Sequence, residues 1–112
     1  MKKLLSALLL LCVSPLWATQ IDGVRLWTAP DHTRLVFDAS SPAEHSVFSL
    51  TGPDRLVIDF EAATLGKEFD AKQVADRHLK GMRHAVRPDG RLRVVLDLKQ
   101  AVRPKTFLLK PN

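Results

Sequence analysis

Three five-residue segments of this sequence share the pattern Arg-apolar-Val-apolar-Asp, at residues 34–38, 55–59 and 93–97. In a β-strand successive side chains point to opposite faces, so each segment presents Arg, Val and Asp on one face and two apolar residues on the other. A guanidinium group binds a carboxylate through two parallel hydrogen bonds, a geometry that suits recognition of an acidic ligand. The charged residues of the three segments are Arg34, Asp38, Arg55, Asp59, Arg93 and Asp97.

These charged faces have two interpretations. The Arg and Asp of one segment lie about 13 Å apart along the strand, so they cannot pair with each other. They can pair with charges on neighbouring strands, where exposed pairs contribute little to stability. The faces are then a solvated exterior of a sheet. In the other interpretation the arginines meet the carboxylates of a ligand.

A second candidate feature is an aromatic residue in the segment 21–27. There Arg25 and Trp27 share one face, and an indole beside a guanidinium suits a sugar ring that carries an acidic group. Trp27 could equally cap the edge of the fold. Arg83 stands at the matching position later in the chain, but Ala85 stands in place of the tryptophan. Such a platform would therefore be one-sided.

Catalytic and metal-binding patterns are missing from the sequence. Its four histidines have neither His-x-x-x-His spacing nor a neighbouring glutamate that alternation would place on the same face. There is no Gly-x-Ser-x-Gly element, phosphate loop or dinucleotide fingerprint. We therefore expect a chain that is not an enzyme and that holds no metal or cofactor.

The first residues predict export. Residues 1–3 are a basic start, residues 4–13 are apolar, and Ala18 is the expected cleavage position. The apolar run is shorter than the roughly 20 residues that span a bilayer. Because no twin arginine is present, we expect a Sec-type signal peptide at residues 1–18 and a periplasmic product. Cleavage would also remove Cys12, the single cysteine.

The remaining chain is expected to be one domain over residues 19–109, with residues 110–112 as the start of a linker or tail. Charge is unevenly spread along it. Residues 19–76 contain five basic and ten acidic residues, whereas residues 77–112 contain ten basic and two acidic residues. In an exported protein this basic region favours an anionic cell-wall polymer or a lipid surface over nucleic acid.

An internal repeat relates the two halves of the domain. Residues 23–50 and 81–109 match at Gly, Arg, Pro, Asp and Phe positions, with an offset of 58 residues before the Pro-Asp turn and 59 after it. We expect two similar halves related by a rotation near two-fold, with Phe48 and Phe107 meeting in the core. Alternation predicts exposed Arg and Asp residues in the three segments and buried apolar neighbours. Those neighbours are Leu35, Phe37, Leu56, Ile58, Val94 and Leu96.

The alternation and the turn signals predict seven short strands. They are expected at residues 21–27, 33–39, 44–50, 55–61, 82–87, 92–99 and 102–109. In the third of these, Phe48 and Leu50 are expected to point inward. A short helix is expected at residues 71–79, after Asp70 as a possible N-cap. The sequence thus indicates an all-β sandwich of two pseudo-symmetric antiparallel sheets, with one short helix in the connection.

Residues 23–27, 33–38 and 53–59 resemble the AMIN domain. This domain is the N-terminal, non-catalytic module of periplasmic N-acetylmuramoyl-L-alanine amidases of the AmiB/AmiC class, and it also occurs in some type IV pilus secretins. The missing twin arginine favours the AmiB-like side. The zinc domain of such amidases is absent, so the chain is either part of a longer amidase or a short product.

The resemblance implies a sandwich of two symmetric sheets that binds peptidoglycan and brings its enzyme to the division septum. It implies that binding residues lie on the outer sheet faces, at Arg25, Trp27, Arg34, Asp38, Arg55 and Asp59. Internal symmetry adds Arg83, Arg93 and Asp97. A docking role on divisome or secretin proteins, and an enzyme that cuts the wall itself, stay open as alternatives. Which face binds, and whether it binds glycan or peptide, is also left open.

Overall fold

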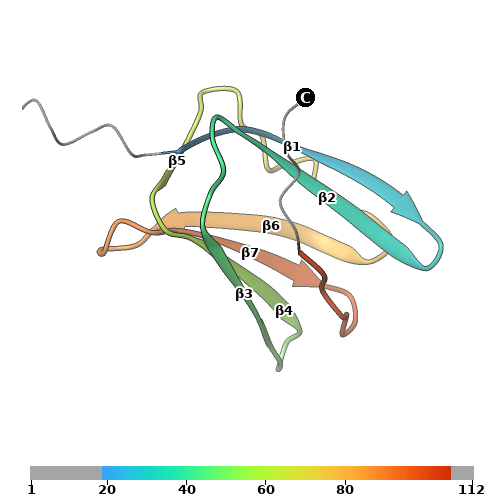
Figure 1. Ribbon diagram of the computed structural model, residues 1–112. Helices are drawn as coiled ribbons and strands as arrows, with labels where there is room; N and C mark the ends of the chain where they lie inside the picture. The colour runs from blue at the N-terminus through green and yellow to red at the C-terminus, as the bar shows by residue number, and fades with distance from the viewer. Residues whose placement is uncertain (1–18, 107–112) are drawn as a thin grey trace, which may run out of the picture.

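The computed structural model describes residues 19–106, which form seven β-strands in two sheets (Figure 1). The strands are β1 (Thr19–Ala29), β2 (His32–Ala39), β3 (His45–Leu50), β4 (Arg55–Phe60), β5 (Ala63–Leu65), β6 (Leu79–Val86) and β7 (Leu92–Leu98). The expected all-β fold with two sheets is confirmed. The described residues contain no helix of the length and apolarity that crossing a membrane requires.

The two sheets differ in size and in strand direction. One has three strands in the order β2-β1-β5, and the other has four in the order β3-β4-β7-β6. All pairings are antiparallel except that between β1 and β5, which is parallel. The three-stranded sheet is therefore mixed, and not wholly antiparallel as expected. The β1–β2 and β6–β7 hairpins, which carry the two copies of the repeat, lie in different sheets.

The charged segments themselves fix the register at the centre of the four-stranded sheet. β4 and β7 each carry one copy of the pattern and run antiparallel, so the Arg of each copy lies opposite the Asp of the other. Arg55 pairs in register with Asp97, and Asp59 pairs with Arg93. A shift of either strand by one residue would turn its apolar set outward and would also separate these charges.

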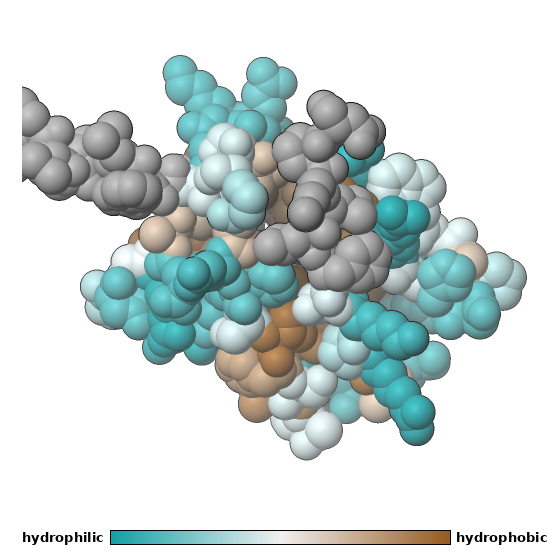
Figure 2. Space-filling view, in the orientation of Figure 1, coloured by the Kyte–Doolittle hydropathy of each residue, from teal (hydrophilic) through white to brown (hydrophobic). Residues whose placement is uncertain are grey.

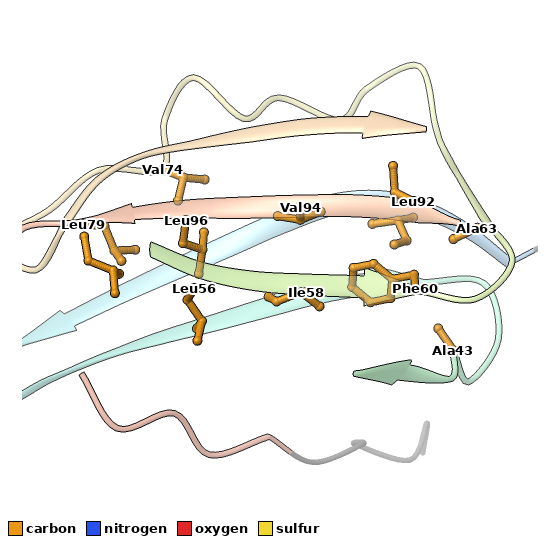
Figure 3. Packing of buried hydrophobic residues seen from close by; sticks show 12 residues of the cluster. Ala43, Leu56, Ile58, Phe60, Ala63, Val74, Leu79, Leu92, Val94 and Leu96 are labelled. Atoms are coloured by element: carbon orange, nitrogen blue, oxygen red, sulfur yellow. The ribbon is translucent and has the colours of Figure 1, made fainter. Parts of the chain in front are cut away.

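The core lies between the two sheets and is built mainly by alternate residues of β4 and β7 (Figure 3). Leu56, Ile58, Val94 and Leu96 are buried, as expected. Leu35 and Phe37 of β2 are only partly buried, but they pack against the same cluster from the opposite sheet. The ring of Phe37 meets that of Phe60 edge-on, at 5.5 Å between centroids.

The expected inward orientation of Phe48 and Leu50 is wrong. Both residues are 39% exposed, while Val47, just before Phe48, packs against the core. The reason is register. Val47 lies opposite Ile58 on the inner face, and Phe48 lies opposite Val57 on the outer face. Val57 is 2% exposed but does not belong to the core cluster between the sheets.

The expected helix at residues 71–79 is also wrong, because the described residues contain no helix. Asp70 does accept a hydrogen bond from the amide of Lys72, but the turn does not continue. Val74 and Leu79 are the buried apolar residues of this stretch. Two such residues give too little apolar surface to hold an isolated two-turn helix.

The expected last strand is not formed over residues 102–106, which have no regular structure. Residues 107–109, and with them Phe107, lie outside the described residues, as do the expected signal peptide and the tail. The contact between Phe48 and Phe107 therefore stays untested, although Phe48 itself points away from the core. The fold still has seven strands, because it contains the short β5, which the sequence did not indicate.

The internal repeat reappears as matching backbone irregularities. The β1–β2 register shifts between Ile21 and Gly23, and the β6–β7 register shifts between Leu79 and Gly81. These positions are related by the offset of 58 residues. Each shift leaves one residue, Asp22 or Lys80, without a cross-strand partner, which is a β-bulge. The two-fold rotation between the halves stays a prediction.

Candidate ligand-binding faces of the sandwich

The nine predicted site residues fall on two separate outer faces. The tryptophan face is the outer side of β1 and β2, with Arg25, Trp27, Arg34 and Asp38. The arginine face is the outer side of β4, β7 and β6, with Arg55, Asp59, Arg83, Arg93 and Asp97. Since the sheets pack through their inner faces, these outer faces point away from each other (Figure 1). They cannot form a single site.

Equivalent Arg–Asp pairs stand on the two faces. Arg25 donates to both oxygens of Asp38, at 3.0 and 2.8 Å, and Arg83 donates to both oxygens of Asp97, at 2.8 Å each. Each pair is diagonal. Asp97 lies directly opposite Gly81, and the arginine two residues further along β6 reaches it across the strands. Gly23 takes the same place opposite Asp38.

A third pair lies deeper, at the centre of the arginine face. Arg93 donates from Nε and Nη2 to the two oxygens of Asp59, at 2.8 Å each. The expectation that Asp59 is exposed is wrong, because it is 2% exposed. The hydrogen bonds from Arg93 hold the pKa of Asp59 below its ordinary value, against the effect of burial, and nearby Arg91 adds to the lowering. Asp59 is therefore an ionised, buried carboxylate.

These bonds limit what the paired arginines can do for a ligand. They are the pairs between neighbouring strands that the sequence left open as one interpretation. Arg25, Arg83 and Arg93 each use Nε and Nη2 for the aspartate. A ligand carboxylate would have to bind the remaining Nη1 edge. Arg55 donates from Nε to the carbonyl oxygen of Pro53.

Trp27 and Arg34 lie next to each other on the tryptophan face, where both can contact a ligand. Trp27 is 49% exposed. The guanidinium carbon of Arg25 lies 5.3 Å from the centroid of its ring, and that of Arg34 lies 5.8 Å away. Unlike Arg25, Arg34 forms no ion pair with any residue of the described chain. A cation without a carboxylate partner thus stands beside an exposed indole.

The outer side of the four-stranded sheet also carries an aromatic residue, Phe48 of β3, which was not predicted to lie there. The guanidinium carbon of Arg93 lies 5.6 Å from the centroid of the Phe48 ring, so this face also combines arginine with an exposed aromatic side chain. The alternation of side chains along β3 could have shown this position. Val47 and Phe48 must point to opposite sides, and choosing Val47 as the inward residue would have placed Phe48 outside.

Asp76 was also missed, and it joins three parts of the fold. Its Oδ2 accepts hydrogen bonds from the hydroxyls of Thr28 and Thr33, at 2.6 Å each, at the end of the β1–β2 hairpin. Its Oδ1 accepts from the amides of His78 and Leu79, at 2.7 and 2.8 Å, where β6 begins. Asp76 therefore fixes the connection before β6 to the hairpin that carries the tryptophan face.

Asp76 should make folding sensitive to acid. Burial alone would raise its pKa, but the four hydrogen bonds outweigh burial and hold the pKa well below its ordinary value. A carboxyl whose folded pKa lies below the unfolded value of about 3.9 stabilises the fold fully above that pH. This contribution is lost as the pH falls through the folded pKa. We expect Asp76→Asn to lower the free energy of unfolding by about 2 kcal/mol at pH 7, and by less at pH 2.

Urea denaturation followed by circular dichroism at pH 7, 4 and 2 checks this expectation. Glu68→Gln is the matched control, because it neutralises an exposed carboxylate of the same connection. A loss of stability in Asp76→Asn that is equal at all three pH values would contradict the assigned role of the carboxylate charge.

No metal site is built by the side chains that the structure describes. Among residues 19–106 there is no group of three or more His, Cys, Asp or Glu side chains that could hold a metal ion.

The AMIN domain family matches residues 23–112, which is most of the chain. The chain belongs to the AMIN domain family. The expected family is thereby confirmed, and the matched region includes both faces and both copies of the repeat.

Two relatives of this AMIN domain are amidases. It is 31% identical over 97 residues to the N-acetylmuramoyl-L-alanine amidase AmiC of Escherichia coli O6:H1, a match that covers 83% of the chain and 23% of the amidase. It is 29% identical over 98 residues to AmiC of Neisseria meningitidis serogroup B, covering 84% of the chain and 24% of that amidase. The AMIN domain thus spans about a quarter of either relative. The AmiB-like assignment stays a prediction.

Proposed function

We propose that this AMIN domain is an exported, non-catalytic module that binds peptidoglycan in the periplasm and holds a cell-wall amidase at the division septum. The similarity to two amidases supports a role in cell-wall cleavage. The basic and apolar start of the sequence supports export. In a longer parent protein, a separate zinc-dependent domain would carry out the cleavage.

The single observation that carries the proposal is the pairing of exposed Trp27 with Arg34. The flat face of an indole can stack on a sugar ring, and a guanidinium without a carboxylate partner can bind an acidic group next to that ring. Peptidoglycan offers both, because its muramic acid carries a lactyl group that ends either in a peptide or in a free carboxylate. We therefore place the binding site on the tryptophan face.

Binding to purified sacculi tests the proposal. The purified chain is mixed with sacculi, the sacculi are sedimented, and the bound fraction is measured from 0.05 to 0.5 M NaCl. We expect saturable binding that weakens as salt rises, because exposed charges are screened within about 10 Å at 0.1 M ionic strength. No sedimentation with sacculi at the lowest salt would contradict a peptidoglycan-binding role.

The non-catalytic part of the proposal is tested with the same sacculi. The chain is incubated with them with and without added zinc, and soluble muropeptides are measured by liquid chromatography. We expect none above the control without protein. Zinc-dependent release of muropeptides would overturn the proposal and make the chain itself an amidase.

A second candidate function is docking on another protein of the division or secretion machinery. The observation that favours it is the exposure of Phe48 and Leu50 on β3, which is an edge strand of the four-stranded sheet. In Figure 2 a brown, apolar area lies over the β3–β4 hairpin. Three results together would favour this function. The chain does not bind sacculi, it is retained by partner proteins, and Phe48→Ser abolishes that retention.

A further inference from the structure

A pocket opens where the β6 bulge, the end of β7 and the β3–β4 turn meet. Its volume is about 320 Å³, near the lower limit of pockets that hold small molecules. The lining residues that matter here are Pro53, Asp54, Lys80, Gly81, Arg83 and Asp97. The pocket therefore adjoins the arginine face and lies away from Trp27.

The charges around the pocket divide into a matched pair and two single charges. Arg83 and Asp97 neutralise each other through their two hydrogen bonds. Lys80 and Asp54 remain, and among the described residues neither forms an ion pair with another side chain or with the other. The lining thus offers one cation and one anion without protein partners. A ligand that carries one charge of each sign would complement them.

The other half of the repeat also has a pocket at its bulge, about 440 Å³ in volume, but its lining differs in charge. Asp22 takes the place of Lys80 at the β1 bulge. There the segment after β5 forms one wall of the pocket, and the amide of Gly66 donates to the carbonyl of Ile21 at 2.8 Å. A Cβ built on Gly66 would come within 2.5 Å of Oδ1 of Asp22, so that carboxylate would have to move. At the β6 bulge, by contrast, a Cβ built on Gly81 would meet no atom within 4 Å.

We propose that this pocket binds a group with an ammonium and a carboxylate on one carbon, as in a free amino acid or at the side-chain end of a branched peptide, with the carboxylate on Lys80 and the free Nη1 edge of Arg83, and with the ammonium group on Asp54. The chemistry of the pocket does not depend on the tryptophan face. That the ligand is a peptide of the cell wall, as opposed to a free amino acid, rests on the proposed function. In that case the domain binds glycan on one face and peptide on the other.

Titration of the ¹⁵N-labelled chain with three small probes tests the inference by NMR. Alanine carries both charges, N-acetylalanine lacks the ammonium group, and alanine methyl ester lacks the carboxylate. We expect alanine to give saturable shifts at the amides of Lys80, Gly81 and Arg83, and each single-charge probe to bind about tenfold more weakly or less. Equal shifts from all three probes, or none at these amides, would overturn the inference.

Two variants make the test specific. Lys80→Asp installs the charge of the other half and should weaken alanine binding about tenfold or more. Gly81→Val should block binding while the domain stays folded, because open space surrounds this position and its φ is not positive. Lys72→Asp is the matched control, since it makes the same charge change at an exposed position outside the pocket. Unchanged alanine binding in both pocket variants would refute the site.

The source of the ligand is identified by repeating the titration with peptides released from purified sacculi. Binding of alanine at the pocket by a chain that fails to sediment with sacculi would sustain the pocket and contradict the proposed function. If the chain sediments with sacculi but no zwitterionic probe binds at the pocket, the proposed function is sustained and the pocket inference is contradicted.

Discussion

Trp27→Ala and Arg34→Ala should each weaken binding to sacculi about tenfold or more, because each removes one half of the proposed contact with a sugar and its acidic group. The free energy of unfolding should change by no more than about 0.5 kcal/mol in either variant. The reason is that Trp27 is half exposed, and Arg34 makes a cation–π contact without an ion pair in the described chain. Co-sedimentation and thermal unfolding measure the two quantities.

The chain provides a matched control for each variant. Phe48→Ala removes an exposed aromatic side chain from the opposite face, and Arg103→Ala removes an exposed positive charge outside both faces. Both controls should retain normal binding. If Phe48→Ala lost binding while Trp27→Ala kept it, the site would lie on the outer side of the four-stranded sheet.

The largest effect on stability is expected at the buried pair of the arginine face. Arg93→Ala leaves the carboxylate of Asp59 buried, with Arg91 at 4.0 Å as the nearest remaining cation. An uncompensated buried charge costs about 3 to 5 kcal/mol. Asp59→Ala should be less harmful, because the side chain of Arg93 is 27% exposed and can turn to solvent. Urea denaturation at pH 7 gives both values.

Two further measurements distinguish the cost of an unpaired buried charge from a simple loss of packing. They are the pH dependence of Arg93→Ala and the stability of the double variant Arg93→Ala/Asp59→Ala. Without Arg93, burial should raise the folded pKa of Asp59 above the unfolded value, so the destabilisation should be present above about pH 4 and relieved below it. Adding Asp59→Ala to Arg93→Ala should recover stability. Equal losses for the two single variants, unchanged by acid, would show that the ion pair is incidental to folding.

The register of the strands could be anticipated because charge and apolar alternation agree. In β4 and β7 an inward Leu or Ile is always flanked by outward Arg, Val or Asp, so both the buried set and the antiparallel pairing follow from the sequence. The repeat likewise predicted equivalent hairpins in two sheets. Its glycines, Gly23 and Gly81, take their place opposite Asp38 and Asp97.

Other features depend on contacts that alternation does not encode. In β3 both Val47 and Phe48 are apolar, so the pattern could not choose the inward residue. The connection before β6 is held by Asp76 and the distant Thr28 and Thr33, and local helix signals carry no information about such contacts. The pocket beside Lys80 was likewise hidden, because its lining comes from three elements that meet only in the folded chain.

The face that binds the glycan is the central claim, and NMR shift mapping with peptide-free glycan fragments tests it most directly. Fragments without peptide avoid the pocket beside Lys80 and keep the lactyl carboxylate. We expect shifts of the Trp27 indole N–H and of the backbone amides around Trp27 in β1 and Arg34 in β2. Shifts confined to β4, β7 and β6, with the Trp27 indole unmoved, would contradict the claim.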